Sequence, residues 1–380
     1  MLTFKIGLLG PTRVGKTSIV TSLLETGQQL LAGTSVTMRP QDAPTERRIA
    51  QNRKHLDACI LGEEFTAGSL AGTEEMQVYN LLMDPGVPGA EILLELLDFP
   101  GGWLDPLRRP ADRQGDWEKC QRFITESTVL IVPIDAAVLM EANTREHRRA
   151  WPHILTMHQV EQVVGEWVKD RVVRAGEPAM LVFCPVKCES YFADNGGTKD
   201  VSATLFERFQ LAYGNVISRA RSEAARAARV EMVYCPVDTL GCVELLDARW
   251  TRDPQGDWEF APFFRIRRRP GGGTPRISRV GVDDVLTSLC AQLLAARKKV
   301  DQHTAVSVRD ARAAAEEFAQ RDEGLLRNVV LWLTGERSDR KNRASRLGMD
   351  EAEVRQRIAA LEKIVDDLGN RELGGRTRRP

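Results

Sequence analysis

The segment that most constrains this chain is GPTRVGKT, residues 10–17, which fits the phosphate-binding loop pattern G-x-x-x-x-G-K-[ST] at every fixed position. Residues 4–9 before it form a short apolar run typical of a buried strand, and residues 18–24 after it predict a helix. A strand, a glycine loop and a helix in this order point consecutive backbone N–H groups at an anion. The segment therefore predicts a binding site for a polyphosphate.

Each residue type in this loop has a physical role. The glycines let the backbone approach phosphate oxygens, Lys16 places a positive charge at the β- and γ-phosphates, and Thr17 offers a hydroxyl to Mg²⁺. Pro11 has no N–H group, so we expect it early in the loop, before the backbone closes around the anion. The residues predicted to bind the nucleotide here are Gly10, Arg13, Val14, Gly15, Lys16, Thr17 and Ser18.

The composition restricts the classes of function. The chain has 380 residues, more than one average domain, and its 53 Lys and Arg balance its 53 Asp and Glu. A formal net charge of zero gives no global attraction to nucleic acid or to an anionic membrane, so we expect neither as a partner. The longest apolar run, residues 129–140, is too short to cross a bilayer, which predicts no membrane insertion.

Two features predict a cytoplasmic location. The N-terminus enters a strand at once, which leaves no room for a signal peptide. The seven cysteines are scattered, without a CxxC pair, which favours reduced thiols over disulfides or zinc.

Short apolar runs alternate with helical periodicity over residues 1–303. Strands are predicted at residues 4–9, 76–83, 92–97, 129–135, 179–184 and 230–235, with helical stretches between most of them. This alternation predicts an α/β fold, a mostly parallel sheet with helices on both faces. We expect two insertions: residues 28–65, which include an amphipathic helix, and residues 243–280, in which a turn at 253–257 indicates an extra β-hairpin.

A second polar element follows a buried strand. The run at residues 92–97 ends in Asp98-Phe99-Pro100-Gly101. An Asp at the carboxyl end of such a strand lies where ligands bind in open α/β sheets, so Asp98 is predicted to reach Mg²⁺, directly or through water. Gly101 can turn its N–H group toward a γ-phosphate.

The C-terminal part, residues 304–380, is predicted to be a small all-helical module. Residues 324–368 contain a helix-turn-helix-like pattern with a turn glycine at Gly348. A helical hairpin that packs on protein is the favoured interpretation, because acidic residues at 350–353 would repel DNA phosphates. The basic tail from Arg371 to Pro380 is expected to be a disordered end.

These elements, in this order, resemble the P-loop GTPases of the translation-factor-related class, which include the small GTPases. The resemblance covers residues 1 to about 300 and rests on the phosphate loop, on the D-x-x-G element Asp98–Gly101, and on two later segments. It implies a P-loop NTPase fold, GTP or GDP as the bound nucleotide, Mg²⁺ as the cofactor, and a protein partner or co-encoded regulator that reads the nucleotide state. The long insertions also resemble those of larger bacterial GTPases in conflict or defence systems, sometimes called double-GTPases.

The two later segments are predicted to bind the base. Residues 186–189, Val-Lys-Cys-Glu, stand where the family has [NT]-K-x-D. The resemblance implies that the stem of Lys187 packs on the guanine and that Glu189 accepts its hydrogen bonds. Glu189 departs from the family by one methylene, and Val186 lacks the side-chain tie to the phosphate loop. Thr239 belongs to the segment 235–240, which stands where a backbone stretch covers the guanine.

The family's switch threonine is a Mg²⁺ ligand that precedes the second strand. Thr73 fits this place best, and Thr66 is the alternative. These two threonines stand at the two ends of a loop of small residues, which has the composition of a mobile segment. The predicted metal ligands are thus Thr17, Thr73 and Asp98, and the predicted catalytic residues are Lys16, Thr73 and Gly101.

The family's next residue after D-x-x-G is usually a glutamine that orients the attacking water, and here it is Gly102. We therefore expect slow hydrolysis unless a partner, or the arginines at 108, 109 and 113, supply the missing group. Solvated surface positions are the commoner explanation for these arginines. Two alternatives stay open: a nucleotide-stabilised scaffold or transcription-linked adaptor with little hydrolysis, and an ATPase.

Overall fold

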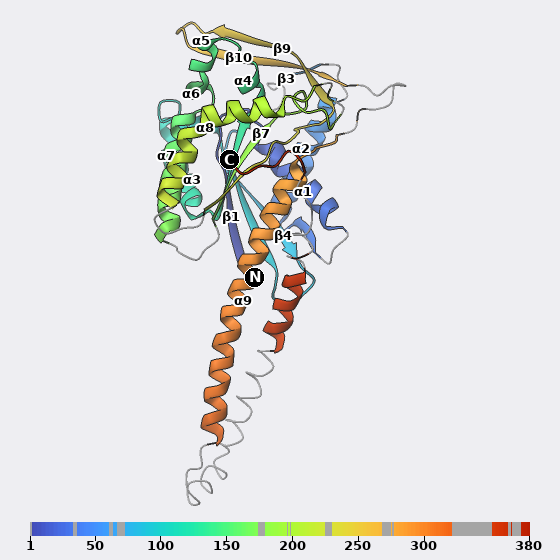
Figure 1. Cartoon of the computed structure of the whole chain (residues 1–380), viewed down its shortest axis with the longest axis vertical. Coiled ribbons are helices and arrows are strands. Elements are labelled where there is room, and N and C mark those ends of the chain that lie inside the picture. The colour runs from blue at the N-terminus through green and yellow to red at the C-terminus, as the bar shows by residue number, and fades with distance from the viewer. Residues whose placement is uncertain are drawn as a thin grey trace, which may run out of the picture.

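The structure is a computed structural model, and it describes residues 2–32, 36–60, 64–66, 73–173, 179–195, 197, 199–224, 230–267, 275, 277–320, 352–363, 366 and 374–380. Among these residues a seven-stranded sheet lies between two layers of helices, and a smaller sheet lies at one end (Figure 1). The predicted α/β class, with a mostly parallel sheet and an additional hairpin, is confirmed.

The large sheet has the strand order β2-β4-β5-β1-β6-β7-β8. Strands β5, β1, β6, β7 and β8 run parallel, whereas β4 and β2 pair antiparallel at one edge. The strands are β1 (Leu2–Leu8), β2 (Thr37–Pro40), β4 (Gln77–Asp84), β5 (Ile92–Asp98), β6 (Val129–Asp135), β7 (Ala179–Val186) and β8 (Val230–Tyr234). Strand β2 was not predicted, because its four residues precede a proline turn and carry no clear alternation.

Helices cover both faces of this sheet because side chains alternate along the buried strands. In β6, Val129 and Ile131 join the core under α1 (Lys16–Leu31) and α9 (Val282–Gln320). Leu130 and Val132 join the opposite core, which is covered by α3, α7 and α8. The helices of that side are α3 (Gln114–Glu126), α4 (Ala136–Met140), α5 (Arg145–Arg149), α6 (Trp151–Ile154), α7 (Met157–Val173) and α8 (Ser202–Ala224).

The two insertions fold together. Helix α2 (Ala43–Ile60) comes from the first one, and the predicted hairpin, β9 (Val243–Arg252) with β10 (Trp258–Ile266), comes from the second. Strand β3 (Glu64–Thr66) extends the hairpin to a three-stranded sheet. A third apolar cluster joins α2, the hairpin and the segment after β8. Residues far apart in the sequence therefore share one small core, which the sequence did not predict.

The C-terminal region departs from the prediction in two ways. Helix α9 continues to Gln320 and passes without a break through the predicted domain boundary at residues 303/304. It extends from the body of the molecule, beside the helical residues 352–363 (Figure 1). Most of the helix-turn-helix-like pattern at 324–368 lies outside the described residues.

The prediction of a disordered C-terminal end is wrong for residues 374–380. These residues return to the edge of the large sheet, where Arg378 forms an antiparallel bridge with Tyr234. Arg376 is only 4% exposed. A basic tail can be buried here because Arg376 forms ion pairs with the carboxylates of Asp194 and Asp238.

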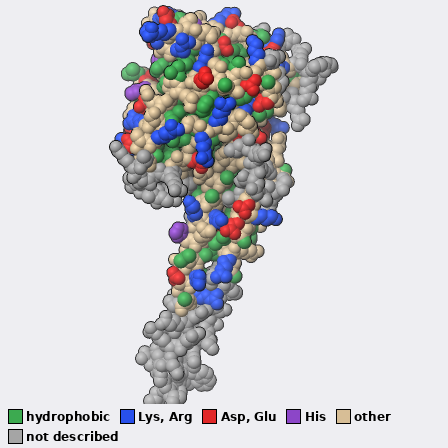
Figure 2. All heavy atoms as spheres, in the orientation of Figure 1, with side chains coloured by type: hydrophobic (Ala, Val, Ile, Leu, Met, Phe, Trp, Pro, Cys, Tyr) green, Lys and Arg blue, Asp and Glu red, His purple; other side chains and the backbone are tan. Residues whose placement is uncertain are grey.

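The visible surface agrees with the balanced composition. Figure 2 shows basic and acidic side chains interspersed over this face rather than gathered by sign. Over the part of the chain that the structure describes, no helix combines the length and the apolar character needed to cross a membrane.

Candidate nucleotide-binding site

The predicted site residues meet at one edge of the large sheet. Because β1, β5, β6, β7 and β8 are parallel, their carboxyl ends lie along the same edge, where ligands bind in open α/β sheets. The phosphate loop follows β1, Asp98 ends β5, Asp135 ends β6, and Lys187 follows β7. A single pocket at this edge reaches from the phosphate loop to Glu189 and Thr239.

The predicted phosphate loop enters α1 through a residue in the left-handed conformation. Gly15 has a φ of 107° at the start of α1, a conformation that strongly favours glycine. Lys16 is buried, and its Nζ donates to the carbonyl oxygens of Gly10 (3.1 Å) and Pro11 (3.0 Å). Burial lowers the pKa of Lys16, and the negative charge of Asp98 opposes this effect. The ammonium group thus lies inside the loop curve, where an anion would relieve the cost of burying it.

The three predicted metal ligands contact one another. Asp98 Oδ2 accepts hydrogen bonds from Thr17 Oγ1 (2.6 Å) and from Thr73 Oγ1 (2.8 Å), and the two hydroxyls are 3.0 Å apart. Asp98 is fully buried, and its second oxygen, Oδ1, has no hydrogen-bond partner. A buried oxygen without a partner is costly, and a cation with oxygen ligands would satisfy it.

The structure separates the two candidate switch threonines. Thr73 reaches the Thr17–Asp98 pair, whereas Thr66 lies in β3 and pairs with Phe263 of the small sheet. The loop between them, residues 67–72, lies outside the described residues. Within the described ranges, no group of three or more His, Cys, Asp and Glu side chains is arranged so that it could hold a metal ion, so the proposed cation site depends on hydroxyls as well as Asp98.

Two neighbouring glycines after β5 have opposite surroundings. A Cβ atom on Gly101 would lie 2.1 Å from the backbone nitrogen of Thr12, so this position packs directly on the phosphate loop. A Cβ on Gly102 would meet Thr12 Oγ1 at 3.8 Å, an ordinary contact, and would meet nothing else within 4 Å. The place where a water-orienting side chain would begin is therefore open.

The arginines at 108, 109 and 113 have structural partners. Arg109 donates to the carbonyl oxygen of Trp103 from Nε (2.9 Å), and its guanidinium lies 4.4 Å from the ring centre of Trp117. Arg108 contacts His153 (2.8 Å), and Arg113 pairs with acidic neighbours. In this conformation these side chains brace the loop after Gly101.

At the other end of the pocket, Lys187 ties two strand ends together. Its φ of 61° is rare for a residue with a side chain, and Arg13 in the phosphate loop has a similar φ of 62°. Lys187 Nζ forms a buried ion pair with Asp135 and donates to the carbonyl oxygen of Arg13 (3.4 Å). Asp135 also caps α4 through the N–H of Ala137 (3.0 Å). Asp135 belongs to none of the predicted motifs; its position at the end of a buried strand was the available sequence signal.

Glu189 is held by the backbone of the segment after β8. Its Oε1 accepts three hydrogen bonds from consecutive N–H groups: Thr239 (2.7 Å), Leu240 (2.8 Å) and Gly241 (3.1 Å). Thr239 Oγ1 in turn accepts from the N–H of Lys187 (3.1 Å). Glu189 Oε2 is buried and has no partner. Burial raises the pKa of Glu189, and the neighbouring charge of Asp238 adds to this effect.

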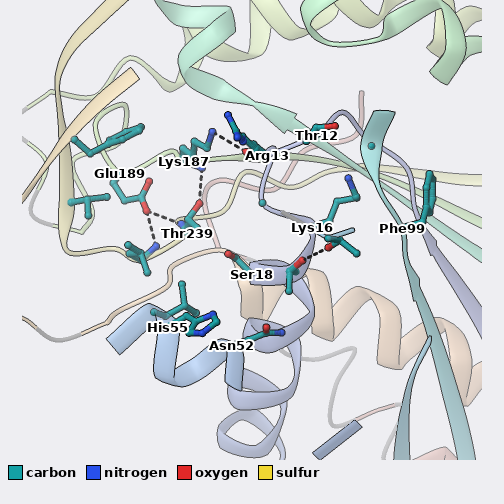
Figure 3. A pocket seen from close by; sticks show the side chains of 18 residues that line it. Thr12, Arg13, Lys16, Ser18, Asn52, His55, Phe99, Lys187, Glu189 and Thr239 are labelled. Atoms are coloured by element: carbon teal, nitrogen blue, oxygen red, sulfur yellow. Dashed lines mark hydrogen bonds between the residues drawn. The ribbon is translucent and has the colours of Figure 1, made fainter. Parts of the chain in front are cut away.

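Apolar side chains from three elements form a wall beside Glu189. Leu56 comes from α2, Leu240 from the segment after β8, and Phe264 from β10. The polar side chains of Asn52 and His55 also line the pocket, and Figure 3 shows them on α2, across from Lys187 and Glu189. No local sequence pattern marks these residues as part of the site, because their position depends on how the two insertions pack.

The remaining predicted residues belong to the loop and its helix. Arg13 and Ser18 line the pocket. Val14 is buried and packs close to Gly10. The structure thus brings every predicted site residue except Thr66 to one edge of the sheet.

Comparison of the chain with protein-family models and with curated proteins finds no match.

Proposed function

We propose that this protein is a Mg²⁺-dependent GTP-binding protein that hydrolyses GTP slowly and acts as a molecular switch. The observation that carries the proposal is the single pocket that joins the phosphate loop to Glu189. Glu189, whose Oε2 has no partner, lines one end. Thr17 and Thr73 line the other end and bind the buried Asp98, whose Oδ1 also has no partner. A nucleoside triphosphate with a bound cation offers groups for both ends.

The preference for guanine rests on hydrogen-bond chemistry. The free Oε2 of ionised Glu189 is an acceptor, and guanine presents two donors on one edge, N1–H and the 2-amino group. Adenine presents an acceptor at N1, which an ionised carboxylate repels. The apolar wall of Leu56, Leu240 and Phe264 offers contact to the flat faces of either purine.

The phosphate end supports charge neutralisation more than covalent chemistry. Thr17, Thr73 and Asp98 would hold Mg²⁺, which when bound would neutralise charge on the phosphates. Lys16 would exchange its two carbonyl partners for phosphate oxygens. Because Gly102 has no side chain, the attacking water lacks an orienting group, and a protein partner that binds the loop after Gly101 would supply it.

An adenine nucleotide is the second candidate, and one observation favours it. Burial raises the pKa of Glu189, and a protonated Glu189 can donate a hydrogen bond to adenine N1. Three backbone N–H groups on Oε1 favour the ionised form, and for this reason guanine is the first choice.

A binding panel tests this proposal. Purified protein is titrated with radiolabelled GTP and ATP, each with Mg²⁺ and with excess EDTA. We expect GTP to bind more tightly than ATP and to require Mg²⁺ for full affinity. Equal affinity for both nucleotides would contradict the guanine assignment, and no binding to either would contradict the whole proposal.

Single-turnover phosphate release tests the slow rate. We expect about 10⁻⁴ s⁻¹ or less for the protein alone, the scale of unassisted small GTPases. A rate near 1 s⁻¹ would show that the water is oriented by a group other than residue 102.

A further inference from the structure

The C-terminal residues Gly374–Pro380 contact the segments that form the base end of the pocket. We propose that this C-terminal segment is part of the base-binding site, and that Arg376 is a positioning residue that holds, through Asp238, the loop whose backbone orients Glu189. The proposal deepens the proposed function and rests on it for the identity of the base.

Arg376 joins two loops that both belong to the base end. From Nη1 it donates to Asp238 Oδ1 (2.8 Å), and from Nη2 to Asp238 Oδ2 (3.2 Å). Asp238 immediately precedes Thr239, the first of the three residues that bind Glu189. The same guanidinium donates from Nε to Asp194 (2.7 Å) and lies 4.1 Å from the ring centre of Phe192. The loop after β7, which carries Glu189, is thus tied to the loop after β8.

The charges explain why an arginine is needed at this place. Asp238 is 1% exposed and Glu189 is also 1% exposed, so two carboxylates are buried close together. Arg376 supplies a buried cation in direct contact with Asp238. Asn195 also donates to Asp238 (2.7 Å), but an amide carries no compensating charge. Without Arg376, the carboxylate of Asp238 would stay buried with no positive charge beside it, which is unfavourable.

The segment is also anchored independently of Arg376. The backbone groups of Tyr234 and Arg378 exchange two hydrogen bonds, of 2.8 and 2.9 Å. Gly374 N–H (2.8 Å) and Thr377 Oγ1 (2.5 Å) both donate to Asp284 of α9. Replacement of Arg376 should therefore loosen the base loop without releasing the whole segment, and this makes the role of its side chain testable.

The test compares Arg376→Ala with a matched control, Arg378→Ala. Arg378 belongs to the same segment, and its guanidinium lies 5.1 Å from the ring centre of Phe206. Its removal takes the same charge from the segment and leaves the backbone bridge in place. Arg376→Lys is the conservative variant, which keeps the charge but cannot bridge Asp194 and Asp238 with one planar fork.

The first measurement needs no nucleotide. Amide hydrogen exchange of Thr239, Leu240 and Gly241 is recorded for the nucleotide-free proteins, with the amides of β6 as the reference for global unfolding. We expect exchange at the three loop amides to become faster by about tenfold or more in Arg376→Ala, to change less in Arg376→Lys, and to stay unchanged in Arg378→Ala. Unchanged loop exchange in Arg376→Ala would overturn the proposal.

The second measurement is the ratio of the affinities for GTP and ITP, which lacks the 2-amino group. One hydrogen bond to a charged acceptor contributes on the order of 10- to 100-fold in affinity, and Arg376→Ala should reduce the ratio toward one. When Asp238 is already replaced by Ala, Arg376→Ala should change the ratio no further, because Arg376 acts on the loop through Asp238. An undiminished ratio in Arg376→Ala would overturn the proposal. Faster loop exchange in a protein whose wild type prefers neither nucleotide would uphold the positioning role and contradict the guanine assignment.

Discussion

The phosphate end and the base end of the pocket are built in different ways. At the phosphate end, the residues from Gly10 to Ser18 are consecutive, and Thr73, Asp98, Phe99 and Gly101 come from elsewhere. At the base end, the wall and its supports come from α2, the segments after β7 and β8, the hairpin β9–β10 and the C-terminal residues. One end is a local motif, and the other is assembled by tertiary packing.

This difference has a physical reason. Phosphate binding needs backbone N–H groups at a helix start, and a short glycine-rich segment provides them by itself. Base binding needs a flat apolar slot and one directed acceptor, which any elements can supply if they pack correctly. We therefore expect the phosphate end to tolerate little change in sequence and the base end to depend on distant contacts.

The largest effect is expected for Lys16→Ala. Loss of the ammonium group should weaken GTP binding by about 100- to 1000-fold, because the ion pair between Lys16 and the phosphates of the nucleotide is lost. Isothermal titration measures the affinity, and circular dichroism checks the fold. Lys119→Ala, which removes an exposed lysine from α3, is the control and should bind GTP like the wild type. Unchanged GTP affinity in folded Lys16→Ala protein would show that the loop does not bind phosphate.

At the base end, Glu189→Gln should act more weakly and selectively. Gln keeps an oxygen for the three loop N–H groups but turns an amide toward guanine's donors, so GTP binding should weaken by roughly 2–3 kcal/mol. ATP affinity should barely fall. Equal losses for both nucleotides would show that Glu189 does not contact the base. Glu189→Ala is a poorer test, because it would also leave three buried N–H groups without an acceptor.

Features that depend on local sequence could be predicted, and features that depend on tertiary packing could not. The parallel strands and their helices were predictable, because periodicity in buried strands and amphipathic helices is a local property. The contact of Thr73 with Asp98 followed from the resemblance rather than from spacing. The role of Arg376 was not predictable, because a basic end without apolar periodicity is normally solvated, and only the buried Asp238 makes it fold back. The same holds for Asn52 and His55, which reach the pocket through the packing of an insertion.

A substitution at Gly102 should raise the rate of GTP hydrolysis at the phosphate end. Gly102→Gln should be tolerated, because the backbone of Gly102 lies outside the left-handed region and a Cβ there meets only Thr12 Oγ1, at 3.8 Å. The added amide can orient the attacking water, so single-turnover hydrolysis should rise on the order of tenfold. Gly101→Ala is the contrasting neighbour: its Cβ would lie 2.1 Å from Thr12 N, and we expect weaker GTP binding rather than faster turnover. No acceleration in a folded, GTP-binding Gly102→Gln protein would mean that residue 102 does not face the water.

The smallest effect is a pH dependence of stability at the base end. Because burial raises the pKa of Glu189 above its ordinary value of 4.5, the folded protein holds this proton more tightly than the unfolded chain does. Wild-type stability should therefore fall as the pH rises from about 4.5 through the raised pKa, by the contribution of this one group.

Glu189→Gln removes that titration but keeps the acceptor for the loop. In the nucleotide-free protein, the difference in Tm between Glu189→Gln and wild type should move in favour of the variant as the pH rises from 4.5 to 8. Titrating groups that do not interact with Glu189 contribute equally to both proteins and cancel in this difference; Asp238, which does interact with it, does not cancel. A difference that stays constant, or that moves in favour of the wild type, would show that the three N–H groups on Oε1 outweigh burial and stabilise the charge. In that case Glu189 is fully ionised before nucleotide arrives, and the adenine alternative loses its only physical support.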